Sequence, residues 1–208
     1  MTDPAAPAAP AALPGLGDAD LPLPALCEAL LFVAAAPTPL DDLARALDAP
    51  RAAVEAALAA LAGQLAGRGL QLQRHGDRYA LVSAPGAARA AARFLGLSRV
   101  EHLSPAALET LAIVAYRGPV TRGEVEALRG VDSSGVLHTL AARALIESVG
   151  RRATVGTPIE YAVTPAFLRH FGLASLDDLP PLGEVDGRPV ATLWDERQRA
   201  ADAPDRAG

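Results

Sequence analysis

The chain of 208 residues contains no lysine, so all 19 of its basic residues are arginine. It therefore has no phosphate-binding P-loop lysine, no amine for a Schiff base and no kinase-type lysine. Its single cysteine, Cys27, excludes an intrachain disulfide and a CxxC metal site. These absences exclude the enzyme classes that depend on lysine or on paired cysteines.

Large side chains and long apolar runs are also scarce. Only 4% of the residues are aromatic, and alanine supplies much of the hydrophobic half of the chain. Two small leucine-rich cores are therefore more plausible than one large core. The longest apolar run, Ala29 to Ala36, is far shorter than the roughly 20 residues that cross a bilayer. With no secretory signal pattern at the N-terminus, we expect no membrane segment and a cytoplasmic location.

The two ends of the chain have a different composition from the middle. Residues 1–21 are rich in alanine, proline and glycine, and residues 183–208 are polar. Such segments bury too little apolar area to order themselves, so we expect both to be disordered tails. Trp194 is interpreted as a lone aromatic residue in a loose tail, in preference to a docking anchor.

The middle of the chain consists of two blocks with the same pattern, beginning at Ala25 and again at Ala106. Each block predicts three helices followed by a pair of alternating strands. In the second block, Ser104 is a suitable N-cap for the first helix. The segment Thr121 to Glu124 has the spacing of a capping box at the start of the second helix. The predicted class is mainly helical with small β-hairpins (α+β).

The element order of each block is that of a winged helix, so we expect two tandem winged-helix domains. The first covers residues 22–96 and includes a linker helix from Gly86 to Leu95. The second covers residues 97–182 and ends with a helix from Pro165 to Phe171.

Several long segments resemble the segregation and condensation protein B family, ScpB. The resemblance covers roughly residues 22–182 and is weaker in the first block. Its most specific segments are Leu103–Tyr116, Gly118–Glu126, Arg129–Leu137, Gly156–Tyr161 and Phe171–Leu182.

The resemblance implies a subunit that is not an enzyme, needs no cofactor and acts in chromosome condensation and segregation. Family members have two winged-helix domains, form homodimers mainly through the first, and bind the central region of the kleisin ScpA. The kleisin bridges the heads of the SMC ATPase. Association with DNA and the nucleoid would then be indirect, through the complex.

The alternative function is that of a winged-helix DNA-binding regulator. Its third helix would carry basic or amide side chains toward base edges, with a basic wing against phosphate. Net charge is +1 over residues 22–96 and −1 over residues 97–182. A protein that contacts many phosphates carries a more basic surface, so these charges do not favour DNA binding. Arg151-Arg152 is the only adjacent basic pair in the second wing. The outward positions of the second block's third helix are expected to be Ser134, His138, Thr139, Ala142 and Arg143.

The first helix suggests a protein interface. Leu26, Leu30 and Val33 share one face and suffice for the core, which leaves Leu31 and Phe32 on either side of it. A helix that is apolar on more than one face must bury the second face. Either the N-terminal tail or linker helix covers Leu31 and Phe32, or these residues form the dimer interface.

Three polar residues are candidates for binding the kleisin. Arg117, Arg122 and Glu126 fall within the segments that match the family, and core packing does not require them. We therefore expect them to be exposed and the second block to carry the main kleisin surface, while the first block mostly dimerises.

No catalytic, cofactor or metal site is predicted. The four histidines, at positions 75, 102, 138 and 170, are scattered and form no HxxxH pair. Cys27 is interpreted as a small buried apolar residue. The acidic pairs at 41–42 and 177–178 are expected to favour the starts of short helices through the helix dipole.

Overall fold

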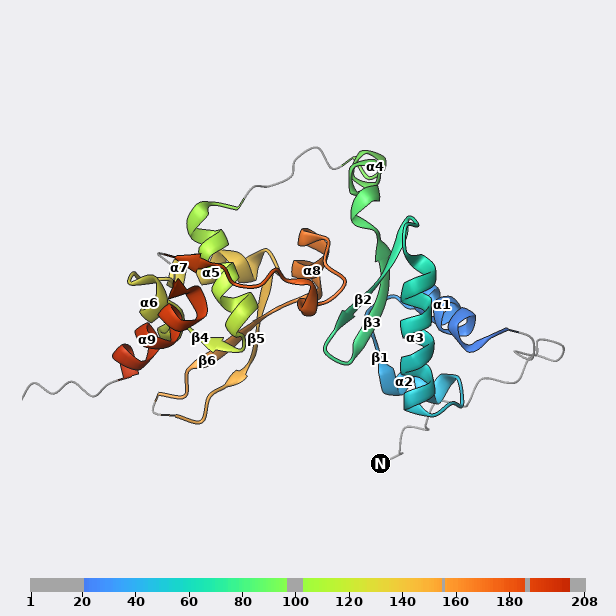
Figure 1. Ribbon diagram of the computed structural model, residues 1–208, viewed down its shortest axis with the longest axis horizontal. Coiled ribbons are helices and arrows are strands. Elements are labelled where there is room, and N and C mark those ends of the chain that lie inside the picture. Colours follow the sequence, from blue (N-terminus) through green and yellow to red (C-terminus); the bar gives the residue numbers. More distant parts are fainter. Residues whose placement is uncertain (1–20, 97–102, 155, 186–187, 203–208) are drawn as a thin grey trace, which may run out of the picture.

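The structure of the protein is a computed structural model that describes residues 21–96, 103–154, 156–185 and 188–202. Within these ranges the chain forms two units, each with its own small sheet and its own core (Figure 1). Both units have the order helix, strand, helix, helix, strand, strand. This is the winged-helix order, so the predicted fold class and tandem architecture are confirmed.

The first unit is built on a three-stranded antiparallel sheet with the strand order β1-β3-β2. A 3-10 turn and a short helix, α4 (Ala88–Phe94), follow it where the linker helix was predicted. The elements of the unit are α1 (Leu23–Val33), β1 (Thr38–Pro39), α2 (Leu40–Ala46), α3 (Arg51–Leu65), β2 (Leu70–His75) and β3 (Arg78–Ser83).

The second unit repeats this arrangement with the strand order β4-β6-β5. Helix α8 (Pro165–Phe171) follows it with the predicted bounds, and a 3-10 helix at Leu176–Asp178 comes next. The elements of the unit are α5 (Pro105–Arg117), β4 (Val120–Thr121), α6 (Arg122–Arg129), α7 (Ser134–Ala142), β5 (Ile146–Arg151) and β6 (Ile159–Val163).

Local sequence signals set the helix boundaries in the second unit. The Ser104 hydroxyl accepts a hydrogen bond from the Ala107 backbone N–H at 3.2 Å, as expected of an N-cap. At the start of α6, the side chains of Thr121 and Glu124 form the predicted capping box. The helix ends at Gly130, whose φ of 72° is the left-handed conformation that favours glycine.

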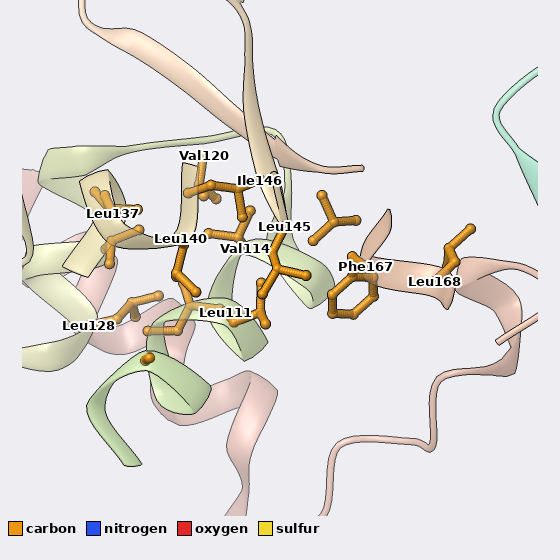
Figure 2. Packing of buried hydrophobic residues seen from close by; sticks show 14 residues of the cluster. Leu111, Val114, Val120, Leu128, Leu137, Leu140, Leu145, Ile146, Phe167 and Leu168 are labelled. Carbon is orange, nitrogen blue, oxygen red and sulfur yellow. The ribbon is translucent and has the colours of Figure 1, made fainter. Parts of the chain in front are cut away.

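The two cores consist mainly of leucine and valine, as the composition predicted. In the first unit, Val54, Leu58, Leu61 and Leu65 of α3 are all buried against α1 and α2. In the second unit, side chains from α5, α7, β5 and α8 converge on one cluster (Figure 2). Its labelled members are Leu111, Val114, Val120, Leu128, Leu137, Leu140, Leu145, Ile146, Phe167 and Leu168.

Helix α1 is rotated relative to the prediction. Leu31 is only 4% exposed and lies in the core, whereas Val33, the predicted core residue, is 74% exposed. The buried stripe runs through Cys27 and Leu31, one turn apart, with Leu30 partly buried beside them. Placing Leu31 outside the core was therefore wrong, because the small Cys27 is part of the core face and shifts that face around the helix.

The C-terminal segment is structured, which corrects the prediction of a disordered tail from residue 183. A hairpin of β7 (Glu184–Val185) and β8 (Arg188–Pro189) leads into helix α9 (Val190–Asp202). Helix α9 lies against α6 (Figure 1), and Trp194 packs on the second core. Trp194 is thus a docking residue and not a lone aromatic in a loose tail. The N-terminal segment 1–20 and residues 203–208 lie outside the described residues.

The two units touch through an extended segment that follows α8. The Arg74 backbone N–H donates to the Ala174 carbonyl oxygen at 2.7 Å, and Gln73 Nε2 donates to the Leu173 carbonyl oxygen at 3.2 Å. His75 Nε2 lies 2.9 Å from the Val163 carbonyl oxygen. Strand β2 is therefore joined to the second unit along one edge.

Candidate protein-binding surfaces

An open groove lies between α6 and the start of α7. One of its lining residues is Val131, an apolar side chain that is 54% exposed. The other lining residues are polar, charged or small, so the surface combines an exposed apolar side chain with charged side chains. The lining residues are Arg122, Glu126, Ala127, Gly130, Val131, Asp132 and Ser134.

Hydrogen bonds hold the rim of this groove in place. Glu126 Oε1 accepts from the Ser133 backbone N–H at 3.3 Å, and Arg122 Nε lies 3.6 Å from the same oxygen. Asp132 Oδ1 accepts from the Ser134 backbone N–H at 2.8 Å. Hydrogen bonds from the backbone and hydroxyl of Ser134 lower the pKa of Asp132, so this carboxylate stays charged at neutral pH. The groove thus presents fixed charges of both signs beside Val131.

The structure brings together two of the three predicted kleisin-binding residues. Arg122 is exposed on the groove rim, and Glu126, half-buried, is on the same rim. Arg117 lies at the end of α5, where Nη1 makes an ion pair of 2.5 Å with Asp195 of α9. The expectation of exposure therefore holds for Arg122, whose side chain is 62% exposed, whereas the Glu126 and Arg117 side chains are 32% and 26% exposed.

The first unit presents a different kind of surface. Phe32 is 78% exposed beside Val33 at the end of α1, in a helix whose core face is occupied by Leu31. Phe94 and Leu95 are exposed at the end of α4. Exposed phenylalanine and valine side chains of this kind mark interaction surfaces when they cluster. Phe32 thus remains a candidate interface residue, while Leu31 does not.

The second wing does not offer a free basic pair. Arg152 Nη1 makes an ion pair of 2.5 Å with Glu124, and Arg152 Nε makes one of 2.8 Å with Glu160. Arg151 donates to the Thr157 carbonyl oxygen at 3.1 Å. Both arginines therefore bind groups of the same chain, which does not favour phosphate binding by this wing.

The wing network also sets the ionisation of Glu124. Burial by itself would raise the pKa of this carboxyl, but hydrogen bonds from Arg152 and Thr121 outweigh it and hold the pKa below its usual value. The Glu124 side chain is 19% exposed. One carboxylate thus caps α6 and neutralises the wing arginine.

The outward face of α7 carries the expected residues, Ser134, His138, Thr139, Ala142 and Arg143, and all are exposed. This set has only one arginine and one histidine for contacts with bases or phosphates. On α3, the exposed residues are largely alanine. Neither third helix is equipped as a DNA-reading helix.

The described part of the chain offers few candidates for a metal site or a reactive side chain. In residues 21–96, 103–154, 156–185 and 188–202, no group of three His, Cys, Asp or Glu side chains could hold a metal ion. Cys27 is fully buried, and burial raises the pKa of its thiol, as expected of a small core residue. Over the same ranges, no helix is long and apolar enough to span a membrane.

Sequence reasoning did not single out Val131, and it assigned Trp194 to a loose tail in preference to a docking anchor. Val131 follows the helix-ending Gly130, where no helical core position requires a valine, and that mismatch was a usable signal. Val190, Leu193 and Trp194 have the i, i+3, i+4 spacing of a helix face. That spacing could have predicted a docked helix.

Comparison with known proteins places the chain in a family. Residues 25–182 match the family model described as segregation and condensation complex subunit ScpB. A protein of Moorella thermoacetica named segregation and condensation protein B is 45% identical over 165 residues, covering 78% of this chain and 84% of its own length. The protein of that name from Syntrophotalea carbinolica is 46% identical over 164 residues, covering 78% of this chain and 83% of its own length.

Solved structures of ScpB proteins also match. The crystal structure of ScpB from Mycobacterium tuberculosis is 38% identical with a TM-score of 0.35, covering 73% of this chain and 95% of its own. A crystal structure of a dimer of the ScpB N-terminal domain complexed with ScpA peptide is 26% identical with a TM-score of 0.33, covering 34% of this chain and 91% of its own. The family match and the curated relatives carry the conclusion: the chain belongs to the ScpB family of segregation and condensation complex subunits.

Proposed function

We propose that this chain is a dimeric, non-catalytic adaptor of the SMC complex that binds the kleisin ScpA mainly through its second winged-helix domain. It acts in chromosome condensation and segregation in the cytoplasm. Its association with DNA is indirect, through the complex. Membership of the ScpB family supports the adaptor over a DNA-binding regulator.

The groove between α6 and α7 carries the assignment of the kleisin surface. Protein interfaces combine apolar with polar side chains, and a groove lined by Val131 together with Arg122, Glu126 and Asp132 has that composition. The rim side chains are held by hydrogen bonds before any partner arrives, which reduces the entropy lost on binding.

The exposed end of α1 supports the proposal that the first domain dimerises. Phe32 and Val33 leave a large apolar surface in water, and a second copy of the chain would cover it. A dimer would also present two kleisin surfaces, so one complex could hold ScpA more tightly than a single domain.

The test is calorimetric titration of ScpA into the full chain and three variants. Arg122→Glu reverses the positive charge at the groove, and Val131→Asp replaces its exposed apolar side chain with a negative charge. We expect each substitution to weaken ScpA binding by about tenfold or more. Arg169→Glu makes the same charge change on an exposed position of α8 and is the matched control. If both groove variants bind ScpA with unchanged affinity, the proposal that this groove binds ScpA is refuted. It would favour binding through the first domain, because the solved complex with ScpA peptide contains the ScpB N-terminal domain.

A further inference from the structure

Helix α9 covers part of the second winged-helix domain with a narrow apolar stripe. Val190, Leu193 and Trp194 are partly buried, and Trp194 packs against the core cluster. Next to this stripe, Asp195 makes the ion pair with Arg117 at the end of α5. The Trp194 side chain and the Arg117–Asp195 ion pair thus both join the helix to the domain beneath it.

The covered surface lies next to the groove proposed for the kleisin. Helix α6 forms one wall of the groove, with Arg122 and Glu126, and is also the helix against which α9 packs. Figure 1 shows α9 beside α6. The family match ends at residue 182, so α9 lies outside it, whereas the surface that α9 covers lies inside it.

We propose that the surface beneath α9 is a helix-binding site that continues the kleisin groove, and that α9 fills it until ScpA displaces it. This inference rests on the proposed function. The occupant is an amphipathic segment of ScpA with a large apolar or aromatic anchor beside an acidic residue. Those two features match what α9 itself offers, Trp194 for the core and Asp195 for Arg117.

The contacts of α9 are suited to release. Asp195 is 55% exposed, and an ion pair of that exposure is weak and screened by salt. Trp194 is only partly buried. Among the described side chains of the segment, Arg188 and Glu196 pair with each other, and Arg199 Nε donates to the Asp195 backbone carbonyl oxygen. These two contacts lie within the segment, so they would persist when α9 leaves the domain.

When α9 covers the site, only the molecules in which the site is open can bind ScpA. The apparent affinity for ScpA is therefore the affinity of the open site multiplied by the fraction of molecules that are open. Loss of an exposed ion pair changes such an equilibrium by up to about fivefold. Removing the whole segment abolishes the competition, so the gain should be larger, about tenfold or more.

Trp194 is the only tryptophan in the chain, so its fluorescence reports the position of α9 directly. The experiment titrates a ScpA fragment without tryptophan into the full chain and records Trp194 emission and its quenching by acrylamide. We expect a red shift and stronger quenching as α9 leaves the core. A parallel calorimetric series measures ScpA affinity for a chain ending at Leu182, for Asp195→Ala and for Glu196→Ala.

Glu196→Ala is the matched control, because it breaks an ion pair within the C-terminal segment and none to the domain. We expect tighter ScpA binding by the shortened chain and by Asp195→Ala, with Glu196→Ala unchanged. Asp195→Ala keeps every core residue, so it decides the question even if the shortened chain folds poorly. Normal ScpA binding with unchanged Trp194 signals and equal affinities would overturn this inference and leave the proposed function standing. A failure of ScpA to bind any of these chains would overturn both.

Discussion

The wing network around Glu124 makes a quantitative prediction about the second domain. Glu124 Oε2 accepts from the Thr121 backbone N–H at 2.7 Å, and its other oxygen pairs with Arg152. The substitution Glu124→Gln keeps the size of the side chain and removes its charge. Arg152 then retains only Glu160 as a charged partner.

The expected cost follows from the exposure of the pair. The Glu124 and Arg152 side chains are 19% and 34% exposed, between the surface and buried cases. A hydrogen bond to a charged group contributes about 1.5–3 kcal/mol to stability. Because Arg152 keeps its bond to Glu160, we expect the loss to lie near the lower end of that range. We expect Glu124→Gln to lower the free energy of unfolding at pH 7 by about 1–2 kcal/mol. In a domain of this size, each kcal/mol lowers the Tm by about 4–8 °C.

The loss should depend on pH with a definite sign. The pKa of Glu124 is lowered in the folded state from the value of about 4.3 that it has when unfolded. Its stabilising contribution is therefore complete above about pH 4.3 and disappears as the pH falls through the folded pKa. The difference between the natural chain and the Gln variant should shrink in the same range.

Urea denaturation followed by far-ultraviolet circular dichroism measures this difference, because it records the loss of the helices of the domain and does not depend on the position of Trp194 alone. Glu147→Gln, at an exposed glutamate on β5, is the matched control and should leave the midpoint unchanged. Equal midpoints for Glu124→Gln and the natural chain at pH 7 would refute the reasoning. So would a difference that persists undiminished at pH 3.

Four further predictions concern other parts of the molecule. Leu31→Ala should lower the free energy of unfolding by about 2–5 kcal/mol, because it opens a cavity in the first core. Phe32→Ala should leave it within about 0.5 kcal/mol and instead weaken the dimer; calorimetry and light scattering separate these effects, and equal destabilisation would argue against the two assignments. Gly118→Ala should destabilise by about 1–3 kcal/mol in thermal unfolding, because its Cβ would lie 2.5 Å from the Val114 carbonyl oxygen, and an unchanged Tm would disprove the clash. Affinity for random duplex DNA at physiological salt should be poorer than about 10⁻⁴–10⁻⁶ M, and submicromolar, salt-steep binding in gel shifts would favour the regulator instead.

Local signals made much of the fold predictable. Ser104, Thr121 and Glu124 act through partners within three residues, so their spacing alone marks the helix starts. The α3 stripe from Val54 to Leu65 was predictable because a long helix repeats its buried positions several times. The order of these elements then predicted the winged helix.

Features that depend on tertiary contacts were harder to predict. The core face of α1 depends on the burial of Cys27 against the rest of the first unit, which periodicity does not specify in a helix that is apolar except at Glu28. Arg152 looked like part of a basic wing because its partners, Glu124 and Glu160, lie on other elements. Docking of α9 through Trp194 likewise depends on a surface built by residues far away in the sequence.

The most direct test of the account is the mass of the chain in solution, alone and with ScpA, measured by light scattering at micromolar concentration. We expect a homodimer of about twice 21.3 kDa that gains the mass of bound ScpA when the kleisin is added. A chain that stays at 21.3 kDa and elutes apart from ScpA would contradict the dimeric, kleisin-binding adaptor proposed here.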